Sequence, residues 1–584
     1  MDLDRPEVTA GTGEQDGVRG AGAAAGTGAG GRGRTTAVRL ALIALPAAFL
    51  ALFFAYPVAA ITARGLYDGG RWHPERIAEV LGDPGILHVV WFTVWQAAAS
   101  TVLTVALALP GAYVLARYDF PGRRALRALV TVPFVMPTVV VGSAFLGLLG
   151  RGGLTEQWWG LRLDEGPAAI LLAHVFFNYA VVVRVVGSLW AQLDPRQEEA
   201  ARVLGAGRWA AWRTVTLPAL APSVVAAAAM VFLFTFTSFG VVQVLGGPRY
   251  ATLEVEIYRQ TAQLLDLPTA AVLTLVQFAA VAALMALHAR AVRRRRGAPA
   301  LVDASRTARR PRGARQRALL AAVLAQIAVL IVVPLAVLVE RSLSGPGGYG
   351  PDFYRDLASA DATGGTFTVA PLEAIGNSLA YAAAATAIAL TVGGLAAVAL
   401  TLRGPGGRTG RLVRGFDALL MLPLGTSAVT VGFGFLVALD EPPLDLRSSW
   451  ILVPLAQALV GTPFVVRTLL PVLRAVDDRL REAAAVLGAP PARVWREVDL
   501  PPARRALLVS AGFAFAVSLG EFGATVFIAR ADAPTLPVAV ARLLGRAGEA
   551  SYGQAMALST ILMLVCAATL LALEGVRTDR SGEL

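Results

Sequence analysis

The residues most indicative of a specific task form a polar motif that occurs twice between long apolar runs. In each copy a Glu-Ala-Ala triplet is followed by a glycine six residues after the glutamate, and by the proline of Leu-Pro thirteen residues after the glycine. Alanine favours helix, glycine can terminate a helix, and proline interrupts one. Each copy therefore predicts a short helix, a glycine turn and a second, amphipathic helix that ends at Leu-Pro, which is a compact knob able to fit a groove in another protein. The copies comprise Glu199, Ala200, Ala201, Gly205, Leu217 and Pro218, and Glu482, Ala483, Ala484, Gly488, Leu500 and Pro501.

Polar side chains inside the apolar runs are the second set of candidates, because such groups in a membrane are functional hypotheses by default. Glu521 is the clearest of them: its carboxylate can be the counter-charge for a cationic substrate, or it can form a hydrogen bond between helices. The same two alternatives, contact with cargo or bonding between helices, hold for the others. These possible substrate-path residues are Glu521, Ser238, Asn178, His174 and Gln243.

The sequence predicts neither enzymatic nor metal chemistry. Cys566 is the only cysteine, which excludes an internal disulfide and a cysteine-based metal cluster. The four histidines are dispersed and no nucleophile–base pair or carboxylate dyad stands out, so we predict no catalytic and no metal-binding residue. The chain has no lysine, and a phosphate-binding P-loop requires one. ATP hydrolysis by that route is therefore excluded.

The elements that must position these residues lie in a lipid bilayer. Hydrophobic residues make up 56% of the chain and charged residues only 16%, against about 25% charged in soluble domains. The mean hydropathy is +0.60. The net charge of +12 does not indicate a nucleic-acid partner, because the arginines cluster at the ends of apolar runs, as membrane orientation requires.

Twelve apolar runs reach the length of about 20 residues that crosses a membrane as a helix. We expect an all-α integral membrane fold. Arginine-rich loops before the first run and after the second, fourth and sixth share one side, which is then cytoplasmic. Both termini and both Glu-Ala-Ala motifs fall on that side of the plasma membrane. The spans are predicted near residues 40–62, 89–116, 127–150, 168–190, 220–245, 268–288, 318–340, 377–401, 414–438, 450–471, 504–529 and 552–574.

The two halves of the chain form an internal repeat. Residues 172–259 align without a gap with residues 455–542, at a constant offset of 283 residues. Six spans is an even number, so both halves enter the membrane the same way round, as two parallel repeats. The predicted organisation is a disordered cytoplasmic tail at 1–36, a first half at 37–288 with its core at 89–288, an arginine-rich cytoplasmic linker at 289–317, a second half at 318–574 with its core at 377–574, and a cytoplasmic tail at 575–584.

The duplicated motif resembles the coupling loop of type I ABC importer permeases, and the chain looks like the fused type that holds two permease halves. Val215 and Val498 stand where that family usually has isoleucine. The resemblance implies a permease subunit that is not an enzyme, whose two loops dock on two ATP-binding subunits that form a homodimer. ATP-Mg would bind to those subunits, with no cofactor in this chain, and an extracytoplasmic solute-binding protein would deliver the substrate.

Local strings resemble one substrate branch of the fused permeases more than another. The strings similar to the thiamine branch are those at 172–178, 238–239, 245–248, 252–258, 518–521 and 535–537, the first of which also occurs in iron-type relatives. We expect thiamine or its phosphates to be the substrate, with ferric iron as the alternative. The alternative class is a secondary transporter driven by an ion gradient. It too would have twelve spans in two parallel halves, but it would not need two identical docking knobs.

Overall fold

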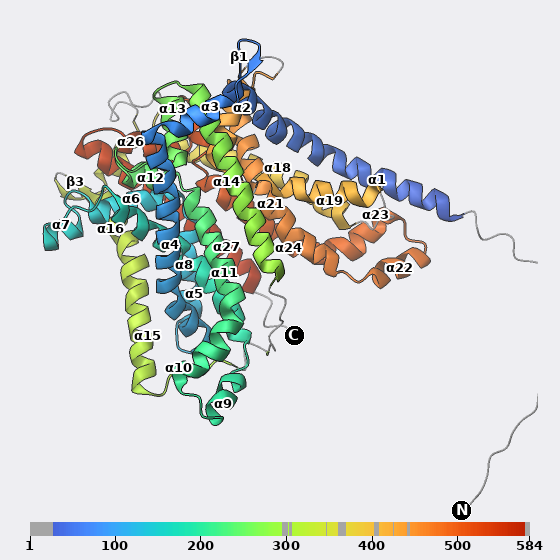
Figure 1. The fold of residues 1–584 in the computed structure, drawn as a ribbon, viewed down its shortest axis with the longest axis horizontal. Helices are drawn as coiled ribbons and strands as arrows, with labels where there is room; N and C mark the ends of the chain where they lie inside the picture. The colour runs from blue at the N-terminus through green and yellow to red at the C-terminus, as the bar shows by residue number, and fades with distance from the viewer. Residues whose placement is uncertain are drawn as a thin grey trace, which may run out of the picture.

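The computed structural model is mostly helical (Figure 1). It describes residues 27–294, 302, 307–345, 347–359, 369–401, 408–423, 426–440 and 444–578. Within those residues, 11 helices are long and apolar enough to cross a membrane, and the shorter apolar helix 428–438 lies in the predicted ninth span. The all-α membrane fold predicted from the sequence is confirmed.

The first half contains eighteen elements in chain order. They are α1 (Thr27–Leu50), the π-helical turn η1 (Ala51–Ala55), α2 (Tyr56–Leu66), β1 (Tyr67–Asp68), β2 (Arg71–Trp72), α3 (Glu75–Gly82), α4 (Pro84–Arg117), α5 (Arg123–Val135), α6 (Thr138–Leu149), α7 (Leu154–Trp159), α8 (Pro167–Gln192), α9 (Arg196–Val203), α10 (Arg208–Ala211), the π-helical turn η2 (Trp212–Thr216), α11 (Leu217–Phe236), α12 (Gly240–Leu245), α13 (Leu253–Ala262) and α14 (Leu267–Arg294).

The second half repeats most of this order. Its elements are α15 (Ala314–Ile327), the π-helical turn η4 (Ala328–Val332), α16 (Val333–Leu343), β3 (Ser344–Gly345), β4 (Gly348–Tyr349), α17 (Asp352–Asp356), α18 (Glu373–Thr401), α19 (Arg408–Met421), α20 (Ala428–Ala438), α21 (Leu452–Ala475), α22 (Asp478–Val486), α23 (Pro491–Val494), the π-helical turn η7 (Trp495–Asp499), α24 (Leu500–Gly520), α25 (Thr525–Ile528), α26 (Leu536–Leu544) and α27 (Glu549–Thr578).

The structural repeat extends to the first span of each half, where the sequence alignment does not reach. In both halves a π-helical turn, a short α-helix and a two-residue antiparallel hairpin follow one another: η1, α2 and β1–β2, then η4, α16 and β3–β4. α1 begins at Thr27, inside the tail that we expected to be disordered, and residues 1–26 of that tail lie outside the described part of the chain.

The third and fifth predicted spans of each half are broken helices, so the prediction of continuous spans there is wrong. The span near 127–150 consists of α5 and α6, which are separated at Met136 and Pro137. Met136 is extended (φ −69°, ψ 142°) because the residue before a proline is pushed out of the helical region. The other broken spans consist of α11 and α12, α19 and α20, and α24 and α25.

Leu-Pro does not end a helix, contrary to the sequence prediction. The helix that starts at Arg208 continues through Pro218 as far as Phe236. The turn before Leu217 is π-helical, and the Leu217 N–H donates to the carbonyl of Trp212, five residues back. A proline normally clashes with the carbonyl four residues earlier, and the wider turn relieves that clash. All four π-helical turns named above lie directly before an X-Pro pair.

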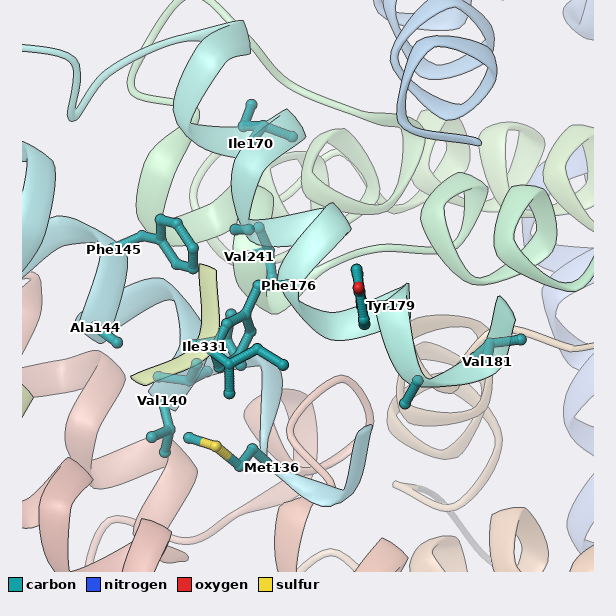
Figure 2. Close-up of a cluster of buried hydrophobic side chains, with 14 of the residues drawn as sticks. Met136, Val140, Ala144, Phe145, Ile170, Phe176, Tyr179, Val181, Val241 and Ile331 are labelled. Atoms are coloured by element: carbon teal, nitrogen blue, oxygen red, sulfur yellow. The ribbon is translucent and has the colours of Figure 1, made fainter. Parts of the chain in front are cut away.

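The first span of each half packs on the core of the other half. Phe49, Leu50 and Phe54 belong to a cluster that is otherwise formed mainly by the second half. Conversely, Ile327 and Ile331 belong to the cluster built mainly by the first half. Figure 2 shows Ile331 among first-half side chains that include Val140, Phe176 and Val241. The boundary between the halves in sequence is therefore not a boundary between two hydrophobic cores.

Candidate functional site

Two short helices, α9 and α22, end in the same way. Leu204 closes α9, and Gly205 follows with φ +92°, a left-handed conformation that glycine adopts without strain. The Ala206 N–H donates to the carbonyl of Ala201 at 3.0 Å, and the Gly205 N–H donates to that of Arg202 at 3.1 Å. These two bonds form a Schellman motif. Helix termination at this glycine is confirmed.

The second copy reproduces that geometry 283 residues later. Gly488 has φ +79°, and the Ala489 N–H donates to the carbonyl of Ala484 at 3.0 Å. The Gly488 N–H donates to the carbonyl of Ala485, also at 3.0 Å. In the view of Figure 1, α9 and α22 lie at the far ends of two diverging groups of helices.

The tips of both helices expose large apolar side chains. Val203 and Leu204 are 87% and 88% exposed, and Val486 and Leu487 are 86% and 87% exposed. Exposed leucines and valines are ordinary when they are scattered singly. Here the same dipeptide is exposed at the same turn of both copies, so the exposure is a repeated feature of the chain and not a scattered one.

Each short helix is tied to the π-helical turn that begins the next span. The Thr216 hydroxyl donates to the carboxylate of Glu198 at 2.9 Å. At the equivalent positions of the second half, the Arg481 guanidinium donates to the carboxylate of Asp499 at 2.8 Å. A force applied to α9 or α22 therefore reaches α11 or α24 through a short, bonded path.

The two halves meet at a pair of equivalent phenylalanines. Phe239 and Phe522 stack with ring centroids 5.1 Å apart and ring planes 22° apart, and both are buried. Each lies at the break of a fifth span, directly before α12 or shortly before α25. Tyr258 packs edge-on against both Phe239 and Phe527. Broken helices that face each other between two repeats are where transporters place their passage.

Glu521 lies next to this aromatic contact and is buried. One of its carboxylate oxygens accepts from the Ala524 N–H at 2.7 Å, and the other accepts from the Thr525 N–H at 3.0 Å. The carboxylate therefore caps the start of α25. This explains why the helix breaks at Glu521, and it places a carboxylate beside the contact between the halves.

The comparisons with known proteins agree with this architecture. The family described as binding-protein-dependent transport system inner membrane component matches residues 108–297. The thiamine transport system permease protein of Brucella abortus (strain 2308) is 29% identical over 85% of this chain and 89% of that protein. Its counterpart from Salmonella typhimurium is 28% identical over 89% of this chain and 91% of that protein. This chain belongs to the permease family of binding-protein-dependent ABC importers.

Other known proteins match only part of the permease. The sulfate transport system permease protein of Escherichia coli is 33% identical over 29% of this chain and 62% of that protein. Among solved structures, a chain of a bacterial ABC transporter that imports alginate has a TM-score of 0.40 and 15% identity, over 46% of the permease and 99% of that chain.

The permease brings three of the predicted path residues together: His174, Ser238 and Asn178. His174 bonds to the Ser100 hydroxyl at 3.0 Å and to the Ser238 hydroxyl at 2.9 Å, so it joins α4, α8 and the end of α11. The Asn178 amide donates to the His174 carbonyl at 3.0 Å. Gln243, on α12, has a buried Oε1 without a hydrogen-bond partner among the described residues. Contact of these residues with cargo stays a prediction.

Sequence reasoning missed two features of this region. The first is the Phe239–Phe522 stack, for which the signal was an identical Phe-Gly pair at equivalent positions of the repeat. The second is Glu254, which is buried and accepts a hydrogen bond from the Gln277 amide at 2.5 Å. The signal there was weaker, because Glu254 belongs to a helix of ordinary composition rather than to an apolar run.

Proposed function

We propose that this permease moves thiamine or a phosphate ester of thiamine across the plasma membrane, driven by two ATP-binding subunits that dock on α9 and α22. The observation that carries the docking is the pair of equivalent helix tips that expose Val203-Leu204 and Val486-Leu487. A homodimer of ATP-binding subunits offers two equal grooves, and this single chain offers two equal knobs. The face that carries α9 and α22 is then cytoplasmic, with both termini on the same side.

ATP-Mg binds to the partner subunits in this proposal, and a solute-binding protein delivers the substrate to the opposite face. Closure of the two ATP-binding subunits would pull on α9 and α22, and their bonds to η2 and η7 would transmit the movement to the fifth spans. The fifth spans carry Phe239 and Phe522 at their breaks, so this movement would separate the stacked rings and open the contact between the halves.

The choice of thiamine is supported by the named relatives and by the residues around the contact. Proteins named as thiamine permeases match the chain over most of its length. The aromatic rings of Phe239, Phe522 and Tyr258, with the Glu521 carboxylate beside them, suit a flat cationic ring, because aromatic faces and carboxylates both attract cations. Ferric iron would make little use of the aromatic rings.

Substituting the exposed apolar tips tests the docking. The variant that carries both Leu204→Asp and Leu487→Asp should retain membrane insertion but lose retention of the ATP-binding subunit and lose ATP-dependent uptake. Leu265→Asp is the matched control, because Leu265 is 75% exposed and lies in the loop between α13 and α14. Normal uptake in the double variant would rule out docking at these tips.

Uptake assays with two cargoes test the substrate. Cells that lack their own thiamine uptake and express this permease with its binding protein and ATP-binding subunit should accumulate labelled thiamine and no labelled ferric iron. Accumulation of iron without thiamine would overturn the choice of substrate while leaving the docking proposal intact. Uptake that persists after depletion of ATP would instead favour a transporter driven by an ion gradient.

A further inference from the structure

An open cavity of about 760 Å³ lies next to α9, and residues of α9 line it. Its walls come from the last turns of α4, the end of α8 and the loop after it, α9, the start of α10, the turn η2, the linker between the halves and the start of α15. None of these elements contributes to the contact between Phe239 and Phe522, so the cavity is separate from the proposed passage.

The linker forms one wall because its backbone is fixed to the first half. The Arg309 N–H donates to the carbonyl of Arg117 at 2.8 Å, and the Asp119 N–H donates to the carbonyl of Arg309 at 3.1 Å. The buried Thr307 hydroxyl donates to the carbonyl of Ala191 at 2.6 Å. Residues 307–309 of the linker are thus held against the ends of α4 and α8.

Positive charge dominates the lining. Two glutamates, Glu198 and Glu199, face a larger set of guanidinium groups. Glu198 is engaged by Thr216, and Glu199 pairs with Arg309 at 3.3 Å. Within the described residues, the other arginines of the lining form no ion pair. The six lining arginines are Arg117, Arg202, Arg208, Arg309, Arg310 and Arg315.

One of these arginines, Arg117, has a buried donor atom whose hydrogen-bonding capacity is not satisfied. The Nη1 atom of Arg117 is buried and has no hydrogen-bond partner among the described residues. A buried donor on a charged group without a partner is costly. An anion in the cavity would remove that cost, because it accepts from Arg117 and from the arginines opposite.

We propose that this cavity binds a phosphate group, either of a small phosphate ester or of an anionic lipid headgroup. The planar guanidinium fork matches the oxygens of a phosphate and donates to two of them at once. The cavity has the size of small-molecule sites, which run from about 300 to 1,000 Å³. Tyr113 and Trp190, which pack edge to face at 5.2 Å, provide an apolar wall for the remainder of the ligand.

Both sources of phosphate can reach the cavity. α4 ends at Arg117, where an apolar span meets the arginine-rich loop, and basic pockets at such positions accept lipid headgroups. The cavity is also open to its surroundings, so a soluble ester can enter it. In either case the ligand joins arginines of the linker, such as Arg310, to Arg202 of α9. It would thereby hold the linker against the first of the two short helices.

The test is binding of labelled pyrophosphate to the full chain in nanodiscs of phosphatidylcholine. We expect saturable binding that the double variant Arg310→Glu with Arg315→Glu weakens by at least about tenfold, because two donors become two repelling charges. Arg312→Glu is the matched control: Arg312 lies in the same linker and is exposed, but it does not line the cavity. Its affinity for pyrophosphate should equal that of the wild type.

A second arm distinguishes the sources. Nanodiscs that contain phosphatidylglycerol should suppress pyrophosphate binding if a lipid headgroup fills the cavity, and native mass spectrometry should then find that lipid on the wild type and the Arg312→Glu control but not on the double variant. If the double variant does not reach the membrane, Arg315→Gln replaces it. Equal binding by the variant and its control, or no binding of either ligand, would overturn the proposal. Neither arm uses ATP or thiamine, so failure here is distinct from failure of the proposed function.

Discussion

Arg481 and Asp499 form an ion pair at 2.8 Å that ties α22 to the π-helical turn η7. The first half makes the same connection at equivalent positions with a neutral donor, the Thr216 hydroxyl, and the carboxylate of Glu198. Burial opposes the charge on Arg481, but the carboxylates of Asp499 and Asp478 outweigh it and raise the pKa of Arg481. The contact is thus kept in both halves, while its chemistry differs.

This difference predicts unequal effects of removing the two contacts. Arg481→Ala leaves the Asp499 carboxylate largely buried without its partner, and should cost α22 about 1–3 kcal/mol of local stability. Thr216→Val removes one hydrogen bond from a neutral donor and should cost less, about 1 kcal/mol. Hydrogen exchange of the α9 and α22 amides measures both. Arg479→Ala, at an exposed neighbour of Arg481, is the control and should change neither helix.

The left-handed glycines predict a second, separable effect. Gly205→Ala and Gly488→Ala should each cost about 1–2 kcal/mol, because an alanine at φ +92° or +79° is strained. Crowding is not the cause, since an added Cβ would meet nothing within 4 Å at either position. We therefore expect frayed C-terminal ends of α9 and α22 in hydrogen exchange, together with slower uptake.

Gly207→Ala serves as the control for these variants. Gly207 lies two residues after Gly205, is equally open, and has φ −62°, which any residue adopts. Its substitution should leave hydrogen exchange and uptake within error of the wild type. A loss of uptake in Gly207→Ala equal to that in Gly205→Ala would show that backbone strain is not what matters in this loop.

Because Phe239 and Phe522 stack where the halves meet, removing one ring should let solute leak through the permease. Phe522→Ala removes about 3–5 kcal/mol of packing at the contact between the halves. We expect labelled thiamine to enter proteoliposomes that contain this variant without ATP, faster than it enters those with the wild type. Phe232→Ala is the control, because Phe232 packs against Phe236 of its own helix and lies outside the contact. A leak of the same size in both variants would place the seal elsewhere.

The sequence predicts best what local backbone physics determines. Gly205 and Gly488 end their helices as predicted, because a left-handed turn after an alanine-rich segment needs nothing from the rest of the fold. Leu217-Pro218 does not end a helix as predicted, because the wider π-helical turn before it relieves the clash that proline causes. Helix propensity alone does not reveal that relief. Pro133 lies inside α5, whereas Pro137 separates α5 from α6, so the presence of a proline does not by itself locate a break.

The pairing of distant elements is harder to predict than their existence. Phe239 and Phe522 are visible in the sequence as equivalent residues, but their stacking depends on how the halves face each other. The same holds for the cavity next to α9, whose arginines come from segments up to 198 positions apart, from Arg117 to Arg315. Composition reveals the positive charge of each segment, and only the fold shows that the charges converge.

The exchange of first spans between the halves gives the last prediction, which a cross-link can test. A Cβ added to Gly434 on α20 would lie 2.9 Å from the Cβ of Pro57 on α2, although the two residues belong to different halves. With Cys566→Ser as background, Pro57→Cys and Gly434→Cys should form a disulfide that keeps the halves joined after trypsin cuts the linker. Pro57→Cys with Gly147→Cys should form none, because Gly147 faces Val337 of the second half instead. If each half packed on its own first span, the second pair would cross-link and the first would not.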